Sequence, residues 1–412
     1  MASRESLTSY PKEKIKILLL EGVHRSAHES LGEDGFTVES QAGVPGGSEL
    51  ARKVDGIHVL GIRSKTRITP EILSKARRLL AIGCFCIGTD QVNLEQATAL
   101  GIPVFNSPFS NTRSVAELVI GEIIVLLRRI FDKSRAAHEG EWQKEAKGCF
   151  EVRNKRLGIV GYGHIGSQVS ILAEALGMQV FYYDIVDKLP MGNAVRMQSL
   201  EKLLKSVDIV SLHVPEDKAT TGMIGEGQLD RMKDGGYLIN ASRGKVVDLD
   251  ALARALHGGK LAGAAVDVFP EEPKGTGEKF ACPLQGIPNV ILTPHVGGST
   301  KEAQENIARD LSAKLIRFIN NGSTMGCVNI PQVHLPVLRD HHRILHIHRN
   351  VPGVLSKVND VFSKFAINVE SQYLKTNEKV GYLIVDVKRD ISDEVFARIK
   401  GIEETIKARI LY

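Results

Sequence analysis

Residues 157–166, with the sequence LGIVGYGHIG, say the most about the architecture of this chain of 412 residues. The apolar start of this stretch predicts a buried strand, and the glycines predict a tight turn into a helix that ends near Gly177. Gly161 allows the bend, Gly163 lets a pyrophosphate approach the backbone, and Gly166 lets the helix pack closely on the strand. The N–H groups at the start of such a helix attract phosphates. The stretch therefore predicts a dinucleotide-binding βαβ unit.

The second strand of this unit, at 180–183, leads directly to Asp184. An acidic residue about twenty positions after the glycines accepts hydrogen bonds from the hydroxyl groups of the adenine ribose. It also repels the 2′-phosphate of NADP, so we expect NAD to be the cofactor. The alternative role for Asp184 is that of a turn residue at the end of a strand.

Short apolar runs alternate with amphipathic stretches on both sides of the glycine turn, which is typical of parallel α/β sheets. Before the turn, the runs that predict strands lie at 15–20, 59–62, 79–83 and 104–105. From Leu157 onward, runs ending at 290–292 predict a second, doubly wound sheet of six strands. Residues 322–340 carry glycine and proline without periodicity and predict a linker. Beyond them, the order strand, helix, strand, strand, helix, strand is ferredoxin-like.

Two helices carry boundary signals. The sequence Ser114-Val115-Ala116-Glu117 is a capping-box pattern, which predicts the start of a helix that stays apolar as far as Leu127. Because that helix is apolar on nearly every side, we expect it to be buried between domains or subunits. Asp248 and Gly258 predict the two ends of another helix.

The composition excludes several classes of protein. The formal net charge of +5 is spread along the chain without a basic block, so we expect no nucleic-acid partner. No stretch approaches the roughly 20 apolar residues that cross a bilayer, and the N-terminus lacks a signal-peptide core, so we expect a cytosolic protein without a membrane partner.

Five cysteines without a CxxC pair predict reduced, small buried residues. The chain also holds the histidines His341, His342, His346 and His348. No carboxylate or cysteine completes a ligand set with them, so we expect no metal.

Arg243, Glu272 and His295 follow strands of the second predicted sheet. The carboxyl ends of parallel strands form the ligand crevice, so these loops can converge. His295 suits the base that takes the hydroxyl proton when a 2-hydroxy acid is oxidised, and Glu272 would orient the imidazole and favour its protonated form. Arg243 would grip a substrate carboxylate through two parallel hydrogen bonds. Taken singly, the three residues could instead be a surface ion-pair partner, a turn residue and a structural histidine.

These residues, together with the stretches 81–89 (AIGCFCIGT), 106–117 and 292–304, give the chain a resemblance to the D-isomer-specific 2-hydroxyacid dehydrogenases. The resemblance covers nearly the whole chain after the first dozen residues. It implies that Arg243, Glu272 and His295 form the catalytic set, and that Asp267 hydrogen-bonds the nicotinamide amide. It further implies NAD contacts from Gly161, Gly163, His164, Ile165, Gly166, Asp184, Ala241, Ser242, Arg243, Asp267, His295, Val296, Gly297 and Gly298.

The resemblance also implies three domains. A flavodoxin-like substrate domain, 1–110 and 299–330, is split by an inserted Rossmann NAD-binding domain, 111–298. A ferredoxin-like ACT regulatory domain, 340–412, follows. With an ACT domain, the resemblance implies that the reaction is the NAD-dependent oxidation of 3-phospho-D-glycerate to 3-phosphohydroxypyruvate in L-serine synthesis, and it leaves a side reduction of 2-oxoglutarate open. The open alternatives are a glyoxylate or hydroxypyruvate reductase of the same family and a dinucleotide-sensing corepressor.

Arg63, Ser64 and Lys65 end a predicted strand of the first domain and offer two cations and a hydroxyl. We expect them to cradle the phosphate and carboxylate of 3-phosphoglycerate, with Lys144 as a further phosphate ligand across subunits, as the family suggests. The alternative is a solvated basic loop. Lys65 stands where bacterial relatives usually carry arginine, so the planar guanidinium fork is lost there.

In serine-inhibited relatives, residues matching His348, Asn350 and Asn368 contact L-serine between two ACT domains. The resemblance therefore implies an L-serine effector and, through paired domains, a homotetramer. Ala366 and Ile367 stand just before Asn368, where relatives commonly carry a glycine that a positive φ angle would require.

Overall fold

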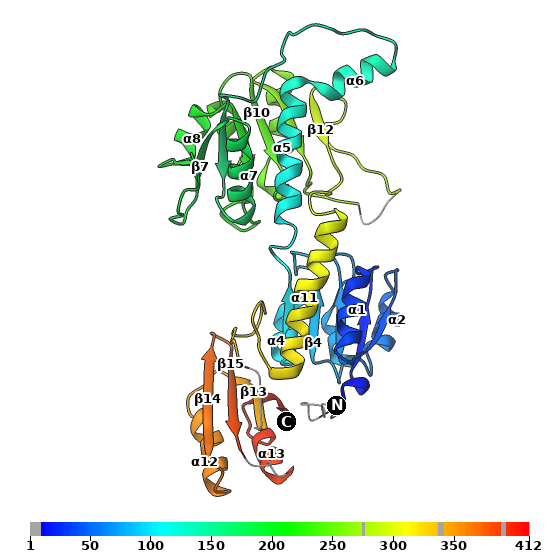
Figure 1. Cartoon of the computed structure of the whole chain (residues 1–412), viewed down its shortest axis with the longest axis vertical. Coiled ribbons are helices and arrows are strands. Elements are labelled where there is room, and N and C mark those ends of the chain that lie inside the picture. The colour runs from blue at the N-terminus through cyan, green and yellow to red at the C-terminus, as the bar shows by residue number, and fades with distance from the viewer. Residues whose placement is uncertain (1–9, 274–276, 337–341, 389–392, 412) are drawn as a thin grey trace, which may run out of the picture. The chain divides into compact units, whose positions relative to one another are not determined.

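A computed structural model describes residues 10–273, 277–336, 342–388 and 393–411 (Figure 1). Its contacts divide the chain into two compact units, 1–110 with 304–412, and 111–303. His341 and the predicted domain start at Asp340 lie outside the described residues. Across the described ranges, no helix combines the length and the apolar composition needed to span a membrane.

The first unit contains a five-stranded parallel sheet in the order β2-β1-β3-β4-β5. This is the flavodoxin-like order that the family resemblance implies, with a topological switch between β1 and β3. The strands are β1 (Lys16–Leu19), β2 (Thr37–Ser40), β3 (Val59–Ile62), β4 (Ala81–Cys84) and β5 (Val104–Asn106). The helices are η1 (Lys12–Lys14), α1 (Arg25–Glu33), α2 (Gly47–Lys53), α3 (Pro70–Lys75) and α4 (Leu94–Ala99).

The second unit contains a seven-stranded parallel sheet in the order β12-β11-β10-β9-β6-β7-β8, which is the doubly wound Rossmann arrangement. Its strands are β6 (Arg156–Val160), β7 (Gln179–Tyr183), β8 (Val195–Arg196), β9 (Ile209–Leu212), β10 (Gly236–Asn240), β11 (Leu261–Val266) and β12 (Val290–Leu292). Its helices are α5 (Thr112–Arg128), α6 (Ile130–His138), α7 (His164–Ala175), α8 (Leu200–Ser206), α9 (Glu226–Arg231), η2 (Gly244–Val246) and α10 (Leu249–His257). Helix α5 lies beside α7 and packs on the sheet (Figure 1).

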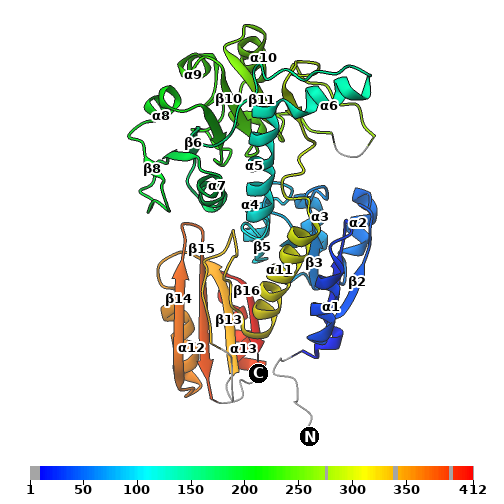
Figure 2. The same ribbon diagram turned by 45° about the horizontal axis from the view of Figure 1, so that its top comes forward.

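The long helix α11 (Lys301–Asn321) leads to a C-terminal antiparallel sheet in the order β14-β15-β13-β16. The elements are β13 (His342–Arg349), α12 (Val354–Lys364), β14 (Val369–Thr376), β15 (Val380–Val387), α13 (Asp393–Lys400) and β16 (Thr405–Leu411). Both helices cover one face of the sheet (Figure 2). The ferredoxin-like prediction is therefore confirmed.

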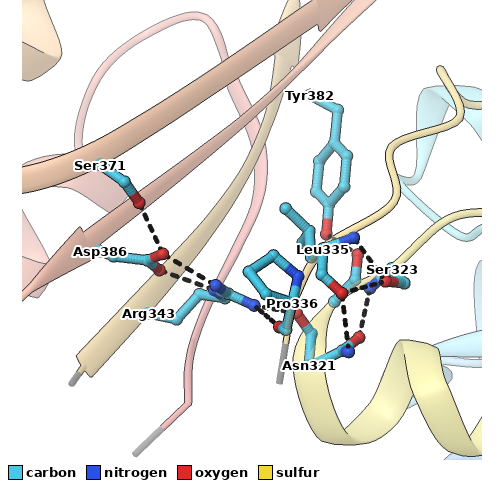
Figure 3. A network of polar contacts seen from close by, with 9 residues as sticks. Asn321, Ser323, Leu335, Pro336, Arg343, Ser371, Tyr382 and Asp386 are labelled. Carbon is cyan, nitrogen blue, oxygen red and sulfur yellow. Dashed lines mark hydrogen bonds and ion pairs between the residues drawn. The ribbon is translucent and has the colours of Figure 1, made fainter. Parts of the chain in front are cut away.

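The other face of this sheet packs within the first unit against α11. Leu345 and Ile384 share a buried cluster with Leu315 and Phe318 of the helix. A polar network joins the same elements, shown in Figure 3. Its centre is Arg343, which is 1% exposed.

Arg343 donates to both carboxylate oxygens of Asp386, at 2.6 and 2.8 Å. Its Nη1 donates to the carbonyl oxygens of Asn321, at 3.0 Å, and Pro336, at 3.1 Å. A guanidinium at the carboxyl end of α11 also complements the helix dipole. The buried ion pair thus joins β13 to β15, and the bonds of Arg343 to two backbone carbonyls tie the C-terminal sheet to the segment that precedes it.

The structure corrects four details. The capping-box prediction at Ser114 is wrong because α5 begins two residues earlier, at Thr112, and the Ser114 hydroxyl is 2.8 Å from that of Thr300. Strands β2 and β8 were not predicted; β2 is a mostly exposed edge strand, and β8 has only two residues. The second sheet therefore has seven strands instead of the predicted six. All five cysteines are free thiols, but Cys84 and Cys327 are buried while the other three are partly exposed.

Candidate active site

The glycine turn has the geometry that the sequence predicts. Gly161 has a φ angle of 92°, and a Cβ there would overlap the carbonyl oxygen of His213. A Cβ on Gly166 would overlap the carbonyl oxygen of Gly161, whereas at Gly163 that position is open space. Packing therefore requires the first and third glycines, and the second leaves room for a phosphate at the start of α7.

Asp184 follows β7 and lies beside this turn. Its Oδ2 accepts a hydrogen bond from the N–H of Tyr162 at 2.8 Å, and its Oδ1 accepts one from the N–H of Val186 at 2.9 Å. A carboxylate can accept about four hydrogen bonds, so acceptor capacity remains for ribose hydroxyl groups. The open space at Gly163 and this carboxylate fit the phosphates and the ribose of a dinucleotide.

His295 and Glu272 form a hydrogen-bonded pair at the carboxyl end of the same sheet. Nδ1 of His295 lies 2.8 Å from Oε2 of Glu272 and 3.1 Å from Oε1. Oε1 also accepts the N–H of Phe269 at 3.1 Å, which fixes the carboxylate. Because Nδ1 is engaged, Nε2 is the ring nitrogen that can exchange a proton with a substrate. The His295 side chain is 52% exposed, so a substrate can reach it.

The pair shifts the titration of both groups. The hydrogen bond with Glu272 raises the pKa of His295, against the effect of burial. Burial by itself would raise the pKa of Glu272, but the hydrogen bonds from His295 and Phe269 outweigh it and lower that pKa. The positive charge of Arg243 acts on both groups, stabilising the carboxylate and opposing the imidazolium. This arrangement suits a base that becomes positively charged when it takes a proton.

Asp267 holds the His295 loop in place. The backbone of His295 is left-handed, with a φ of 54°, and its N–H donates to the carbonyl oxygen of Asp267 at 2.8 Å. The Asp267 carboxylate accepts from the N–H groups of Val296 and Gly297, at 2.8 and 2.9 Å, and from the hydroxyl of Thr293 at 2.6 Å. No local sequence pattern predicts this role of Asp267, because its partners lie 26 to 30 residues away along the chain.

Arg243 lies in a turn that follows β10 and is stabilised by Asn240. The amide of Asn240 donates to the carbonyl oxygen of Arg243 at 3.0 Å, while its Oδ1 accepts from the N–H and hydroxyl of Ser242. A Cβ on Gly244 would overlap the backbone of Phe269, so this glycine lets the Arg243 turn pack against the Glu272 loop. The guanidinium donates to the carbonyl oxygen of Ser242 at 2.7 Å.

The predicted substrate cradle lies in the first unit. Arg63 is half-buried, and Ser64 and Lys65 are exposed, directly after β3. Lys144 is exposed and belongs to the second unit, in the segment after α6.

The predicted effector residues fall at two ends of the C-terminal sheet. His348 is buried, with its Nδ1 2.8 Å from the carbonyl oxygen of Arg349, and its ring occupies the space above Gly381. Asn350 is exposed just after β13 and donates to the carbonyl oxygen of Asn377 at 2.7 Å. Asn368 is exposed before β14, whose first residue pairs with Val387 at the opposite end of β15 from Gly381. One chain therefore brings His348 and Asn350 together but not Asn368.

Comparisons with known proteins agree with this architecture. Residues 120–297 match the model of the D-isomer specific 2-hydroxyacid dehydrogenase NAD binding domain, and residues 344–407 match that of the AHAS small subunit-like ACT domain. A D-3-phosphoglycerate dehydrogenase of Dictyostelium discoideum is 53% identical over 405 residues, covering 98% of this chain and 99% of the relative. Another, from Escherichia coli strain K12, is 51% identical over 407 residues, with the same coverage.

A solved structure shares the fold of most of the chain. It is a D-lactate dehydrogenase from Aquifex aeolicus complexed with NAD and lactic acid, with a TM-score of 0.66 and 29% identity. The match covers 77% of this chain and all of that structure. The NAD-binding fold predicted from the glycine turn is confirmed.

Proposed function

The chain belongs to the D-3-phosphoglycerate dehydrogenases of the D-isomer specific 2-hydroxyacid dehydrogenase family, and we propose that Arg243, Glu272 and His295 carry out its reaction. The reaction is the NAD-dependent oxidation of 3-phospho-D-glycerate to 3-phosphohydroxypyruvate. When bound, NAD supplies the acceptor for the hydride that leaves C2. The chain's own residues position the substrate and manage the proton.

His295 takes the C2 hydroxyl proton on Nε2 as the C2–H bond breaks. Glu272 keeps Nδ1 protonated and stabilises the imidazolium that forms. Arg243 binds the substrate carboxylate and holds C2 in line for hydride transfer. In the reverse direction, the imidazolium of His295 returns the proton to the carbonyl oxygen.

The observation that supports this assignment most strongly is the hydrogen bond of 2.8 Å between His295 and Glu272. We expect His295→Ala to lower kcat/KM at least about 100-fold, since a positioned general base contributes roughly 10²- to 10⁴-fold. His138, exposed at the end of α6 in the same unit, provides the control variant His138→Ala. A kcat/KM within about threefold of wild type for His295→Ala would reject the assignment.

We also propose that Arg63, Ser64 and Lys65 bind the phosphate and carboxylate of the substrate, with Lys144 supplied by a second copy of the chain. The positions of the first three residues after a parallel strand support this role.

In the C-terminal domain, His348 and Asn350 of one chain would meet Asn368 of another around L-serine. That pairing would extend a dimer to a tetramer, and light scattering with and without L-serine tests it.

A further inference from the structure

Glu21 is a buried carboxylate that the reaction does not use. It is 9% exposed and lies two residues after the end of β1. Its Oε1 accepts hydrogen bonds from the backbone N–H groups of Arg63, at 3.0 Å, and Thr66, at 2.8 Å. Its Oε2 accepts one from the N–H of Lys65 at 2.9 Å. One carboxylate thus binds three backbone donors of the loop 63–66, in charge-assisted hydrogen bonds.

Gln91 holds the same loop from its carbonyl side. This side chain is 6% exposed, and its amide nitrogen donates to the carbonyl oxygen of Arg63 at 2.7 Å. The same nitrogen lies 3.3 Å from the carbonyl oxygen of Gly88 and 3.3 Å from Sγ of Cys86. Donors and acceptors of the loop backbone are therefore both engaged by buried side chains from other segments.

The two strands involved meet at the topological switch of the first sheet. Glu21 follows β1 and the loop 63–66 follows β3, and the chain order reverses between these neighbouring strands. Ligands of open α/β sheets bind outside the carboxyl ends of the strands at such a point. Glu21 itself has a left-handed backbone, with φ of 61°, a strained conformation that persists only when its surroundings fix it.

Because Glu21 engages the N–H groups of residues 63, 65 and 66, these groups are not available to a phosphate. Within the loop 63–66, Glu21 leaves the N–H of Ser64 for a phosphate, and the other contacts must come from side chains, of which those of Ser64 and Lys65 are exposed. The direction of these side chains follows from the backbone that Glu21 and Gln91 hold.

We propose that Glu21 and Gln91 are positioning residues that shape the loop 63–66 and thereby set the preference for a phosphorylated over an unphosphorylated 2-hydroxy acid. This inference rests on the proposed role of Arg63, Ser64 and Lys65 in substrate binding. The two carboxylate oxygens of Glu21 accept hydrogen bonds from the loop, and the amide nitrogen of Gln91 donates one to it. Neither residue touches the reacting atoms.

The test compares KM and kcat of the full chain for 3-phosphohydroxypyruvate and hydroxypyruvate in the NADH-linked reduction. Glu21→Gln replaces one acceptor oxygen by an NH2 group. Because this group is a donor, it cannot accept the backbone N–H groups of the loop, and the loop should shift. A displacement of about 1 Å in a positioning group can lower activity roughly 100-fold, so we expect KM for the phosphorylated substrate to rise at least about 10-fold. KM for NADH should stay within about threefold of wild type, and the loss with hydroxypyruvate, which keeps the carboxylate but has no phosphate, should be much smaller than the loss with the phosphorylated substrate. The control is Glu71→Gln, the same change at an exposed site on α3.

Gln91→Met is the second variant, and it tests the positioning of the loop 63–66 if Glu21→Gln does not fold. It keeps the side-chain length, removes the donor to Arg63 and should raise the same KM. Unchanged KM values, or an equal loss with both substrates, would overturn the inference, because an equal loss indicates a general structural role. A wild-type protein that does not prefer the phosphorylated substrate would contradict the proposed function itself, whatever the variants do.

Discussion

At the scale of the residue, His295 combines a left-handed backbone, with φ of 54°, and a ring held by Glu272. Such a conformation costs on the order of 1–3 kcal/mol and is maintained by the surrounding structure. Here Asp267 supplies that support through its backbone carbonyl and both carboxylate oxygens. The strained backbone of His295 therefore helps to position the imidazole that acts as the base.

Glu272→Gln should move the pH profile of the reaction. Oxidation needs neutral His295, so kcat/KM for oxidation falls as pH drops through the pKa of His295, whereas reduction falls as pH rises through it. Because Glu272 raises that pKa, the variant should move both limbs to lower pH and lower the maximal rate. Glu271→Gln, an exposed neighbour, is the control. An acid limb that stays in place would contradict the role of Glu272.

Ala366 ends α12 in a Schellman motif, with a φ of 52° and bonds from residues 366 and 367 to the carbonyl oxygens of Ser363 and Phe362. The positive φ that the sequence suggested is thus present without a glycine. Ala366→Gly should raise the free energy of unfolding by about 0.5–1 kcal/mol, because glycine avoids the left-handed penalty. Ala397→Gly, inside α13, should lower it by a similar amount. Urea unfolding measures both, and equal signs would be inconsistent with this reasoning.

The sequence revealed Arg243, Glu272 and His295 because each follows an apolar strand within a short, chemically distinctive loop. It did not reveal Glu21, Gln91 or the way in which Asp267 holds the His295 loop, because their partners include backbone groups 28 to 45 residues away along the chain. No local pattern encodes such contacts, and only the arrangement of neighbouring strands brings them together.

At the scale of the element, α5 carries a buried acid in an apolar setting. Glu122 is 4% exposed, and neither carboxylate oxygen has a hydrogen-bond partner. Burial, together with the nearby charge of Asp267, raises the pKa of Glu122 to about 8. The folded chain thus keeps this group protonated in a range where the unfolded chain releases the proton.

This difference makes stability depend on pH. Between the unfolded pKa of about 4.5 and the folded value of about 8, the free energy of unfolding should fall by about 1.4 kcal/mol for each pH unit from this group. Glu122→Met should remove that contribution, so its gain in Tm over wild type should grow from pH 5 to pH 8. Glu117→Met, exposed on the same helix, should show no such growth. A pH-independent difference for Glu122→Met would contradict the buried protonated state.

The ends of helices were predicted correctly where only neighbouring residues in the sequence determine them. Asp248 caps α10 as predicted, accepting the N–H of Ala251 at 3.0 Å. The Ser114 signal failed because tertiary contact with Thr300 uses its hydroxyl. Strand β2 was missed because an exposed edge strand has no apolar run.

At the scale of the whole molecule, Arg343 ties the C-terminal sheet to the end of α11 through the carbonyl oxygen of Asn321, and its ion pair with Asp386 joins strands β13 and β15 inside the sheet. Arg343→Met should destabilise the chain by about 3–5 kcal/mol, because it leaves Asp386 buried without a counter-charge. Adding Asp386→Asn should restore part of that loss. Arg398→Met, on an exposed pair of α13, is the control. If calorimetry gives the same Tm for Arg343→Met and Arg398→Met, the Arg343 network does not stabilise the contact between the C-terminal sheet and α11.

Taken together, the residues of both units serve one reaction, in which this chain acts on a phosphorylated 2-hydroxy acid with NAD. The most direct measurement compares kcat/KM of the wild-type protein for 3-phosphohydroxypyruvate, hydroxypyruvate and 2-oxoglutarate in the NADH-linked reduction. We predict that the phosphorylated substrate exceeds each of the others by at least about 10-fold, since charge-assisted hydrogen bonds to its phosphate contribute roughly 1.5–3 kcal/mol each. An equal or higher value for hydroxypyruvate would contradict the account and indicate a hydroxypyruvate reductase, and absence of turnover with all three would contradict an enzymatic role.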